Sequence, residues 1–303
     1  MKTAIIGAIF VDVKGFSAVP YAPTGTNIGT VHIMHGGVCR NVCEDFGNQG
    51  EEAAFVSMTD NTALGRDVRE RLARTGVDLK HMLLSEEGMG LWLAILDEHG
   101  DLVGSISKQP DFSPLEEYLK AHIDEILQEC GSVVLEIDTS ATIAEIVLDS
   151  AERLGKPVYV IVANLGVIAN HTEYLGRVRC FICNNIEAGK LLGKDLTDKS
   201  PFELLDTALE VSGRFRIPSV VITMGDQGAV YYDSVTGEAG HCPPIPTHMV
   251  DSTGAGDAFF AGTVMALNRH RPLWQAVRVG TQLASATLAC DQSSCARIEG
   301  LLD

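Results

Sequence analysis

The chain has 303 residues with 23 Lys and Arg against 40 Asp and Glu, so its formal net charge is −17 at pH 7. With 46% hydrophobic and 21% charged residues, the composition is that of a globular protein with a large core, which excludes intrinsic disorder. Because a strongly acidic chain has no basic surface to replace phosphate counterions, a nucleic-acid partner and an anionic membrane surface are also excluded.

Neither export nor membrane insertion is predicted. The opening residues 1–16 hold too short an apolar run for a signal peptide, and no small-residue cleavage site follows. No apolar stretch approaches the roughly 20 residues that span a bilayer. The eight cysteines include Cys180-x-x-Cys183, but no second pair with zinc-binding spacing follows it. We therefore expect reduced thiols in a cytoplasmic protein.

Short apolar runs alternate with amphipathic helical patterns along the chain. Strands are predicted at residues 3–10, 53–57, 91–96, 133–137, 158–163, 179–183 and 219–223. Helices are predicted at residues 38–46, 62–74, 115–129, 142–154, 187–192, 201–211, 257–268 and 272–289. Several strands are apolar on both faces, as in strands that helices cover on both sides. We expect an α/β fold, doubly wound, with a mostly parallel central sheet and helices on both faces.

Two stretches break this alternation. Residues 12–35 hold Gly and Pro between β-prone residues, and residues 88–110 are typical of a hairpin with its turn at residues 97–100. We expect both to form a small sheet inserted in a single domain of residues 1–303. A sheet with one face that cannot reach the core must cover something else, so a lid or a homodimer surface is expected.

The most informative segment is VDSTGAGDAFFAG at residues 250–262. Gly254, Ala255 and Gly256 precede a predicted helix, where unpaired backbone N–H groups and the helix dipole favour an anion. Asp257 lies in the first turn, beside that anion. This pairing suits phosphoryl transfer, because the N–H groups stabilise charge on the phosphoryl oxygens while the carboxylate takes the proton of an attacking hydroxyl.

Two considerations limit this interpretation. The helix dipole lowers the pKa of Asp257, so orienting the hydroxyl is expected to be the larger part of its work. The alternative is that Asp257 only stabilises a helix start and that the glycines only form a turn. No P-loop, HRD, HExxH or GxSxG sequence occurs, so phosphate binding is not of the P-loop kind.

Four motifs together resemble the PfkB (ribokinase-like) carbohydrate kinase family. DSTGAGDAFFAG at 251–262 resembles its C-terminal signature, and GGVCRN at 36–41 its N-terminal one. NNIE at 184–187 is similar to its Asn-x-x-Glu motif, and TMGDQG at 223–228 to its Thr-x-Gly-x-x-Gly nucleotide loop. The motifs occur in family order across nearly the whole chain. The resemblance implies an ATP- and Mg²⁺-dependent kinase of a small sugar or nucleoside.

The resemblance also implies a role for each matching residue. The implied catalytic group is the base Asp257 with the anion hole Gly254, Ala255 and Gly256. The implied substrate ligands are Asp12, Gly37, Asn41 and Glu136. The implied nucleotide ligands are Asn184, Thr223, Gly225 and Gly228, with further base contacts from residues 284–290. The implied metal ligands are Glu187 for Mg²⁺, through water, and Asp251 and Thr253 for a monovalent cation such as K⁺.

The acceptor is the least defined part of this reading. Residues 11–15, residues 26–29 and Arg40-Asn41 are more similar to the pseudouridine kinase branch than to ribokinase, so the 5′-hydroxymethyl group of pseudouridine is the first expectation. Yet Phe10 stands where that branch has Asn. The proline of that branch and the Asn-Asp-Met that follows its lid are also replaced by other residues here. The alternatives are a free sugar or sugar acid (ribose, fructose or 2-keto-3-deoxygluconate), another nucleoside, and a catalytically silent nucleotide sensor.

Three further side chains have open roles. Arg40 is expected either to pair with the γ-phosphate or substrate, or to lie on a helix surface bonded to Glu44 or Asp45. Lys108 is expected to be solvated rather than catalytic. Trp92 is expected in the core or a dimer contact.

Overall fold

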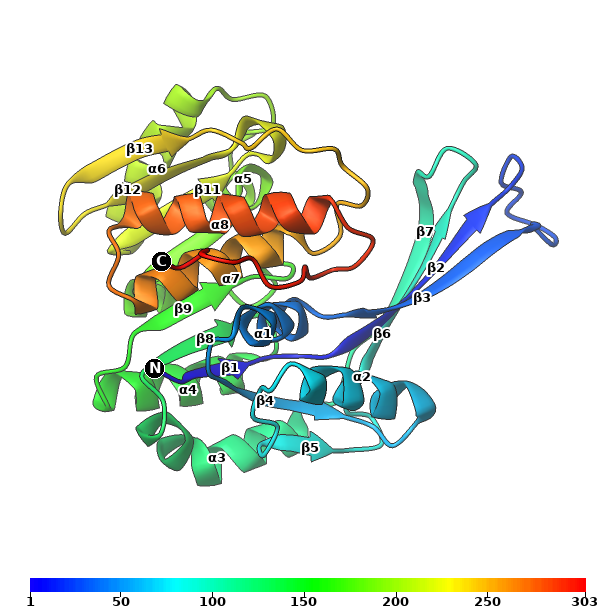
Figure 1. Ribbon diagram of the computed structural model, residues 1–303, viewed down its shortest axis with the longest axis horizontal. Helices are drawn as coiled ribbons and strands as arrows, with labels where there is room; N and C mark the ends of the chain where they lie inside the picture. Colours follow the sequence, from blue (N-terminus) through cyan, green and yellow to red (C-terminus); the bar gives the residue numbers. More distant parts are fainter.

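The computed structural model describes all residues, Met1–Asp303 (Figure 1). The strands are β1 Thr3–Ile6, β2 Phe10–Ser17, β3 Gly29–Gly36, β4 Ala53–Thr59, β5 Met82–Leu84, β6 Gly90–Leu96, β7 Leu102–Lys108, β8 Ser132–Glu136, β9 Val158–Ile161, β10 Cys180–Asn184, β11 Ser219–Thr223, β12 Ala229–Asp233 and β13 Glu238–Cys242. The helices are α1 Val38–Gln49, α2 Ala63–Arg74, α3 Ser113–Gln128, α4 Ala141–Arg153, α5 Asn185–Leu192, α6 Pro201–Phe215, α7 Ala255–Asn268 and α8 Leu273–Leu288, with short 3-10 turns at Thr172–Arg177 and Gly225–Gln227. None of these helices is long and apolar enough to cross a membrane.

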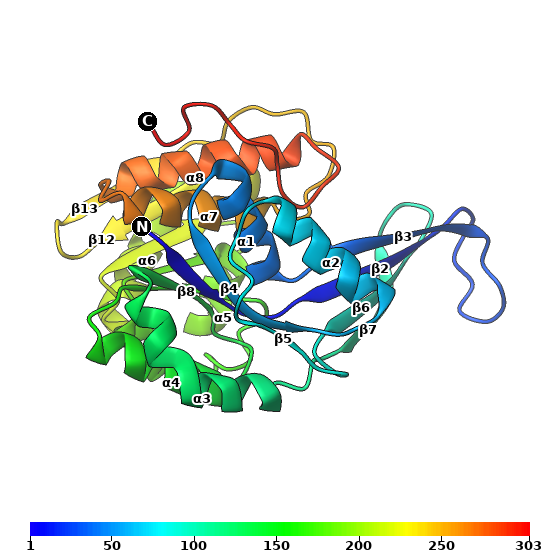
Figure 2. The same ribbon diagram turned by 60° about the horizontal axis from the view of Figure 1, so that its bottom comes forward.

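Nine strands form the main sheet, sheet A, in the order β13-β12-β11-β10-β9-β8-β1-β4-β5. All neighbours from β5 to β11 run parallel, whereas β12 and β13 pair antiparallel at one edge. Helices α1, α2, α7 and α8 cover one face and α3 to α6 the other (Figures 1 and 2). The prediction of a doubly wound, mostly parallel sheet is confirmed, and the antiparallel pair is an addition to it.

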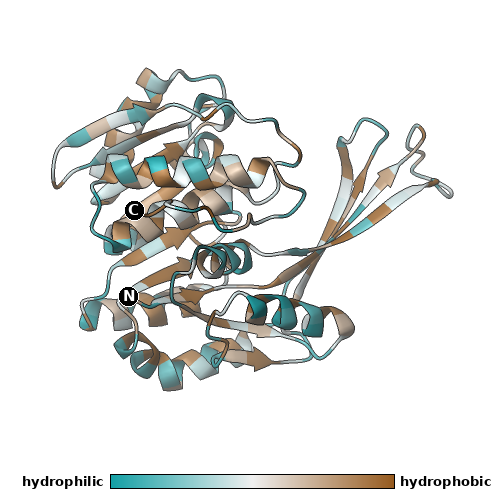
Figure 3. Cartoon of the chain, viewed as in Figure 1, coloured by the Kyte–Doolittle hydropathy of each residue, from teal (hydrophilic) through white to brown (hydrophobic).

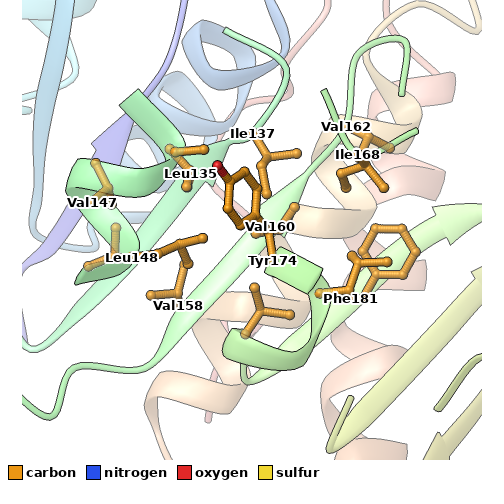
Figure 4. Packing of buried hydrophobic residues seen from close by; sticks show 14 of the residues in the cluster. Leu135, Ile137, Val147, Leu148, Val158, Val160, Val162, Ile168, Tyr174 and Phe181 are labelled. Carbon is orange, nitrogen blue, oxygen red and sulfur yellow. The ribbon is translucent and has the colours of Figure 1, made fainter. Parts of the chain in front are cut away.

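The two faces of sheet A have separate cores because successive strand side chains point to opposite sides. In β1, Ala4 and Ile6 join the core beneath α3 to α6, whereas Ile5 joins the core beneath α1, α2, α7 and α8. Apolar segments accordingly gather on the inner strands, with polar segments on the outer sides of the helices (Figure 3). Figure 4 shows Leu148 of α4 packed close to Val158 of β9 in the first of these cores.

The predicted strand at residues 3–10 is wrong in its second half, because the chain leaves sheet A after Ile6. At Gly7 there is no room for a side chain: an added Cβ would lie 2.5 Å from Cys39 Cβ and 2.6 Å from Glu136 Oε2. The next N–H, of Ala8, donates to Glu136 Oε2 at 2.9 Å instead of to a neighbouring strand. This link carries the chain from sheet A into a second sheet.

The second sheet, sheet B, has the order β3-β2-β6-β7 and projects from the body (Figure 2). Its strands β2 and β6 pair in parallel, each with an antiparallel partner at its other side. The register places Asp12 beside Met34 and Trp92, so these three side chains lie on one face, which we call the inner face. The outer face bears Val31 and Ile33, which are 68% and 58% exposed. The predicted small sheet is therefore present.

Candidate active site

Helix α7 begins with a set of unused backbone donors. Its first residue is Ala255, its N-cap is Gly254, and no side chain caps it. The N–H groups of Gly256 and Asp257 have no acceptor in the protein. Gly254 has φ +81°, and an added Cβ there would lie 2.1 Å from the carbonyl oxygen of Ser293, so no larger residue fits. The result is an anion cradle that a phosphoryl group can occupy.

The carboxylate of Asp257 stands beside this cradle and is held by α1. Helices α1 and α7 pack together, and Asn41 Nδ2 donates to Asp257 Oδ2 at 2.6 Å. Burial raises the pKa of Asp257 to about 6, although the bond from Asn41 and the charge of Arg40 lower it. The expectation of a pKa lowered by the helix dipole is therefore corrected, because burial outweighs it. A pKa near neutrality makes Asp257 the better base.

A pocket of about 350 Å³ lies under the near end of sheet B. It is lined by Ala8, Phe10, Asp12, Gly37, Val38, Trp92, Ser107, Gln109, Phe112, Glu136, Asp138, Thr139, Ala163 and Asn164, and we call it the Asp12 pocket. Three of the four predicted substrate residues line it. The fourth, Asn41, contacts Asp257 instead. The pocket thus combines carboxylates with three aromatic side chains.

Two glycines make room for Asp12 and for the turn behind it. An added Cβ at Gly36 would lie 2.5 Å from Asp12 Oδ1. Gly37 has φ +97°, and a Cβ there would lie 2.7 Å from the carbonyl oxygen of Ala8. Burial raises the pKa of Asp12, while the charges of Lys14 and Arg40 lower it. The carboxylate is therefore partly dehydrated and ready to accept hydroxyl donors.

Glu136 has both a structural and a site position. It is 4% exposed, at the end of β8, and one oxygen accepts the Ala8 N–H that starts the link to sheet B. Burial raises its pKa to about 7. The prediction that Glu136 serves only as part of the polar wall missed this second role, which depends on a contact between residues 128 apart.

Several residues of the Asp12 pocket escaped sequence reasoning. Trp92, expected in the core or a dimer contact, is half-buried and lines the pocket. Phe112 follows β7 and lacks any motif, whereas Gln109 lies in the stretch that replaces the Asn-Asp-Met of the pseudouridine kinase branch but was given no role. Asp138 follows β8 and accepts the backbone N–H groups of residues 163, 164, 165 and 167 at 2.9 to 3.2 Å. A carboxylate just past the end of a buried parallel strand is the signal that could have found Asp138.

A second pocket, of about 650 Å³, opens on the other side of the anion cradle. It is lined by Thr223, Gly225, Asp226, Gly228, Pro244, Ile245, Pro246, Thr247, Met249, Ser252, Ala255, Gly256, Phe259, Thr281, Ala284, Ser285 and Leu288, and we call it the Thr223 pocket. It brings three predicted nucleotide residues together with two of the anion hole. Ala284 and Leu288 fall within the stretch expected to contact the base.

Asn184 and Glu187 do not line that pocket, and they have a local structural role. They form a capping box at the start of α5: Asn184 Oδ1 accepts the Glu187 N–H at 2.8 Å, and Glu187 Oε2 accepts the Asn184 N–H at 2.8 Å. Burial, opposed by the Asn184 bond and reinforced by the nearby charge of Asp138, raises the pKa of Glu187.

The donor set at Glu187 fits a hard cation with few protein ligands. Its Oε1 has no hydrogen-bond partner in the protein, and the carboxylate is near enough to Asp257 to raise the pKa there. No group of three or more His, Cys, Asp or Glu side chains could hold a metal ion. Mg²⁺ commonly uses one or two carboxylates and completes its shell with water and phosphate oxygens, so Glu187 suits it.

The residues predicted for a monovalent cation lie where sheet B approaches the cradle. Asp251 Oδ1 accepts the Thr253 N–H at 2.8 Å, and Thr253 Oγ1 accepts from Lys14 Nζ at 3.1 Å. Lys14 stands on the inner face of β2, two residues after Asp12. No motif pointed to Lys14, yet it brings a positive charge from sheet B to the phosphate-binding segment.

The structure shows the surroundings and the partners of Arg40 and Lys108, whose roles the sequence left open. The Arg40 side chain is 0% exposed, so the expected position on a helix surface is wrong, although the expected partner Glu44 is correct. Lys108 is exposed and pairs with Glu87, as expected of a solvated lysine.

Comparisons with known proteins show the family and the fold of this chain. Residues 2–297 match the family described as pfkB family carbohydrate kinase. The chain belongs to this family. It is therefore a carbohydrate or nucleoside kinase with a ribokinase-like fold. A guanosine-inosine kinase of Exiguobacterium acetylicum is 33% identical, with 96% of each chain covered.

Two more comparisons give a further sequence relative and a structural neighbour of this pfkB-family kinase. A pseudouridine kinase of Escherichia coli (strain K12) is 26% identical over 96% of this chain and 91% of its own. The structure of Arabidopsis thaliana ribokinase complexed with ribose and ATP superposes with a TM-score of 0.84 at 19% identity, covering 99% of this chain and 97% of that one. The first is a homologue, and the second shows the shared fold.

Proposed function

We propose that this kinase transfers the γ-phosphoryl group of ATP to the 5′-hydroxyl of a nucleoside, with guanosine or inosine as the first candidate. The observation that supports a nucleoside acceptor is the lining of the Asp12 pocket, where a carboxylate lies on the same wall as Phe10, Trp92 and Phe112. Asp12 suits ribose hydroxyls, while aromatic faces suit a planar base. The 33% identity to a guanosine-inosine kinase supports a purine base.

The polar lining supports a base with a lactam edge. Gln109 and Asn164 each offer an amide N–H₂ and a C=O beside the aromatic walls. Guanine and hypoxanthine present adjacent N–H and C=O groups that such amides can pair with, whereas a free sugar has no such edge.

Pseudouridine, the first expectation from sequence, is the second candidate. Its uracil ring carries the same kind of lactam edge, and a pseudouridine kinase is 26% identical over nearly the whole chain. The substitution of Phe10 for the asparagine of that branch favours the larger purine, because a ring at Phe10 can stack on a base but cannot hydrogen-bond to it.

The proposed chemistry uses the residues of α1 and α7. The acceptor hydroxyl donates to the free Oδ1 of Asp257, which takes the proton as the oxygen attacks the γ-phosphorus. The bond between the γ-phosphorus and the β–γ bridging oxygen breaks, and ADP leaves. The N–H groups of Gly256 and Asp257 receive the phosphoryl oxygens, with Gly254 keeping the cradle open. Lys14, at the Thr253 hydroxyl, adds positive charge from sheet B.

The Thr223 pocket is the proposed ATP site. Apolar Ala284, Leu288 and Pro246 suit an adenine ring, and Gly225 and Gly228 allow close backbone approach. Glu187 is the proposed Mg²⁺ ligand, acting through water with Asn184 beside it, and Mg²⁺ supplies charge neutralisation of the phosphates when bound. Asp251 and Thr253 are the proposed carriers of a K⁺ site.

An ADP-release assay with Mg-ATP tests the proposal against guanosine, inosine, adenosine, pseudouridine, uridine, ribose and fructose. We expect the highest kcat/KM with guanosine or inosine. A preference for pseudouridine would support the second candidate, and turnover of a free sugar alone would refute the nucleoside assignment. ATP binding without turnover of any acceptor would favour the sensor alternative.

We also propose that the outer face of sheet B is covered by a second copy of this chain. By register, this face carries Val13, Val31, Ile33, Leu93 and Ile106 and no Asp or Glu. A chain with net charge −17 repels its own copies, so a face free of carboxylates is the most favourable place for self-association. A shared two-fold axis would bring this face onto itself.

A further inference from the structure

Arg40 is a fully buried guanidinium with at least one acceptor at each of its three nitrogens. Its Nε donates to Gly36 O at 3.3 Å, and its Nη2 donates to His35 O at 2.7 Å and to Ser293 Oγ at 2.7 Å. Nη1 pairs with Glu44. A buried charge is costly unless it is paired and hydrogen-bonded, and Arg40 meets both conditions. It contacts neither of the two site pockets, so it is not free to bind a phosphate.

The last partner of Arg40 is the side chain of Asn41. Nη2 of Arg40 donates to Asn41 Oδ1, and Asn41 Nδ2 donates to Asp257 Oδ2 at 2.6 Å. A guanidinium has only donors, so the amide oxygen of Asn41 must face Arg40 and its N–H₂ must face Asp257. Arg40 thereby fixes which way the amide points. With Oδ2 of Asp257 occupied by this N–H₂, Oδ1 is the oxygen left for a substrate hydroxyl.

The same guanidinium touches the two segments that flank the base. His35 and Gly36 end β3, the strand through which sheet B returns to α1. Ser293 belongs to the C-terminal segment, and its own carbonyl oxygen lies against Gly254. One planar group with five donors therefore joins the end of sheet B, the amide of Asn41 and the segment behind the anion cradle.

We propose that Arg40 is a positioning residue. Through Asn41 it orients the Asp257 carboxylate toward the acceptor hydroxyl, and it holds this carboxylate at a fixed position relative to the end of sheet B. This proposal rests on the proposed role of Asp257 as the base. Arg40 touches no reacting atom and acts only through its neighbours. Lysine cannot replace it, because a point charge with three donors cannot hold Asn41, Glu44 and the end of β3 in one plane.

The test is a double-mutant cycle of Arg40→Lys and Asn41→Ala, assayed with Mg-ATP and the best acceptor of the panel. We expect Arg40→Lys to lower kcat about 10–100-fold, the cost of a small misplacement of a reacting group, with little change in KM for ATP. In the Asn41→Ala background the same change is expected to cost little more. Losses that multiply in full would overturn the proposal, because Arg40 would then act independently of Asn41.

The pH profile separates positioning from a purely structural role. The bond from Asn41 and the charge of Arg40 both lower the pKa of Asp257, so loosening them should move the acid limb of kcat/KM to higher pH. Arg71→Lys is the matched control, since Arg71 donates to Glu44 at 2.7 Å but does not touch Asn41, and its acid limb should stay in place. A limb that moves in neither variant would refute the proposal.

A second variant covers the case in which Arg40→Lys does not fold. Arg40→Gln combined with Glu44→Gln removes both charges of the buried pair and leaves only the partly exposed Arg71 without its carboxylate, and it should show the same lowered kcat and moved limb. A folded pair variant with wild-type kcat and limb would also overturn the proposal. If the wild type itself shows no acid limb, the assignment of Asp257 fails instead, and the cycle in kcat still decides whether Arg40 works through Asn41.

Discussion

Asn41 Nδ2 lies 2.6 Å from Asp257 Oδ2, which joins two signature motifs that are 216 residues apart in the sequence. The contact forms because α1 and α7 pack on the same face of sheet A. It uses one oxygen of the carboxylate and leaves the other for a ligand. The N-terminal and C-terminal signatures are therefore one structural unit around a single carboxylate.

Asp257→Asn tests the proposed base. We expect kcat to fall about 10²–10⁴-fold, the usual contribution of a positioned general base, while the KM values for ATP and acceptor change little. The amide is of the same size, so the melting temperature should stay close to that of the wild type. Activity retained within a few fold would show that the carboxylate only helps to begin α7.

The pH dependence of kcat/KM follows from the pKa of Asp257, about 6. Because a base works only when deprotonated, kcat/KM should rise with pH through about 6 and level off above it. Rates measured in overlapping buffers at constant ionic strength check this. A rate that falls as pH increases through this range would contradict the assignment of Asp257 as base.

Glu136 gives a prediction for stability. Its pKa is raised from 4.5 to about 7 by burial, so the folded state binds the proton more tightly than the unfolded state. The stability that this proton contributes is present at low pH and is lost as pH rises toward and through about 7. Glu136→Gln removes this titration, so its melting temperature should gain on that of the wild type between pH 5 and 8. A constant difference over that range would refute the prediction.

Much of the fold could be predicted from the sequence because it depends on local hydrophobic patterns. Strands β9 and β11 are short two-sided apolar runs, and such runs predicted the parallel sheet. The end of β1 was not predictable in this way, since the Ala8 N–H donates to Glu136 Oε2 instead of continuing the ladder, and Glu136 is 128 residues away. That constraint comes from residues distant in the sequence.

The same distinction between local patterns and long-range contacts applies to the candidate site. The cradle of α7 was predicted from Gly254 and its neighbours, because helix-start chemistry is local. Trp92 was misjudged, since its place beside Asp12 depends on the register between β6 and β2. The spacing of Asn184 and Glu187 is that of a capping box, a local role that the resemblance to a nucleotide motif does not indicate.

Two glycines of the nucleotide loop predict different outcomes for the same substitution. Gly225 has φ +57° with open space around an added Cβ, whereas Gly228 has φ +86° and a Cβ there would lie 2.2 Å from the carbonyl oxygen of Cys242. Gly225→Ala should cost about 1–2 kcal/mol of stability from backbone strain alone. Gly228→Ala should cost more and raise the KM for ATP, because the backbone of β13 must shift. Thermal melting and ATP titration of both variants check this; equal effects would contradict it.

Phe10→Leu tests the aromatic wall. The ring lies against bare Gly90, where an added Cβ would be 2.4 Å from the ring. If a base stacks on Phe10, losing the ring should raise the KM for a nucleoside about 5–100-fold, equivalent to about 1–3 kcal/mol, with ATP unaffected. Phe202→Leu, at a side chain 76% exposed on α6, is the control and should change neither KM. An unchanged nucleoside KM in Phe10→Leu would remove the base from this wall.

The outer face of sheet B gives the last prediction, on assembly. Ile33 and Ile106 lie on this face and are 58% and 69% exposed, which is unfavourable unless a partner covers them. Ile33→Asp should convert a dimer, of twice the 32.5-kDa chain mass, into a monomer, because a carboxylate would be buried without a partner. Val235→Asp, at a side chain 73% exposed between β12 and β13, carries the same charge change and should leave the mass unaltered. Light scattering after gel filtration distinguishes the two, and a wild-type mass of one chain at all concentrations would refute the dimer.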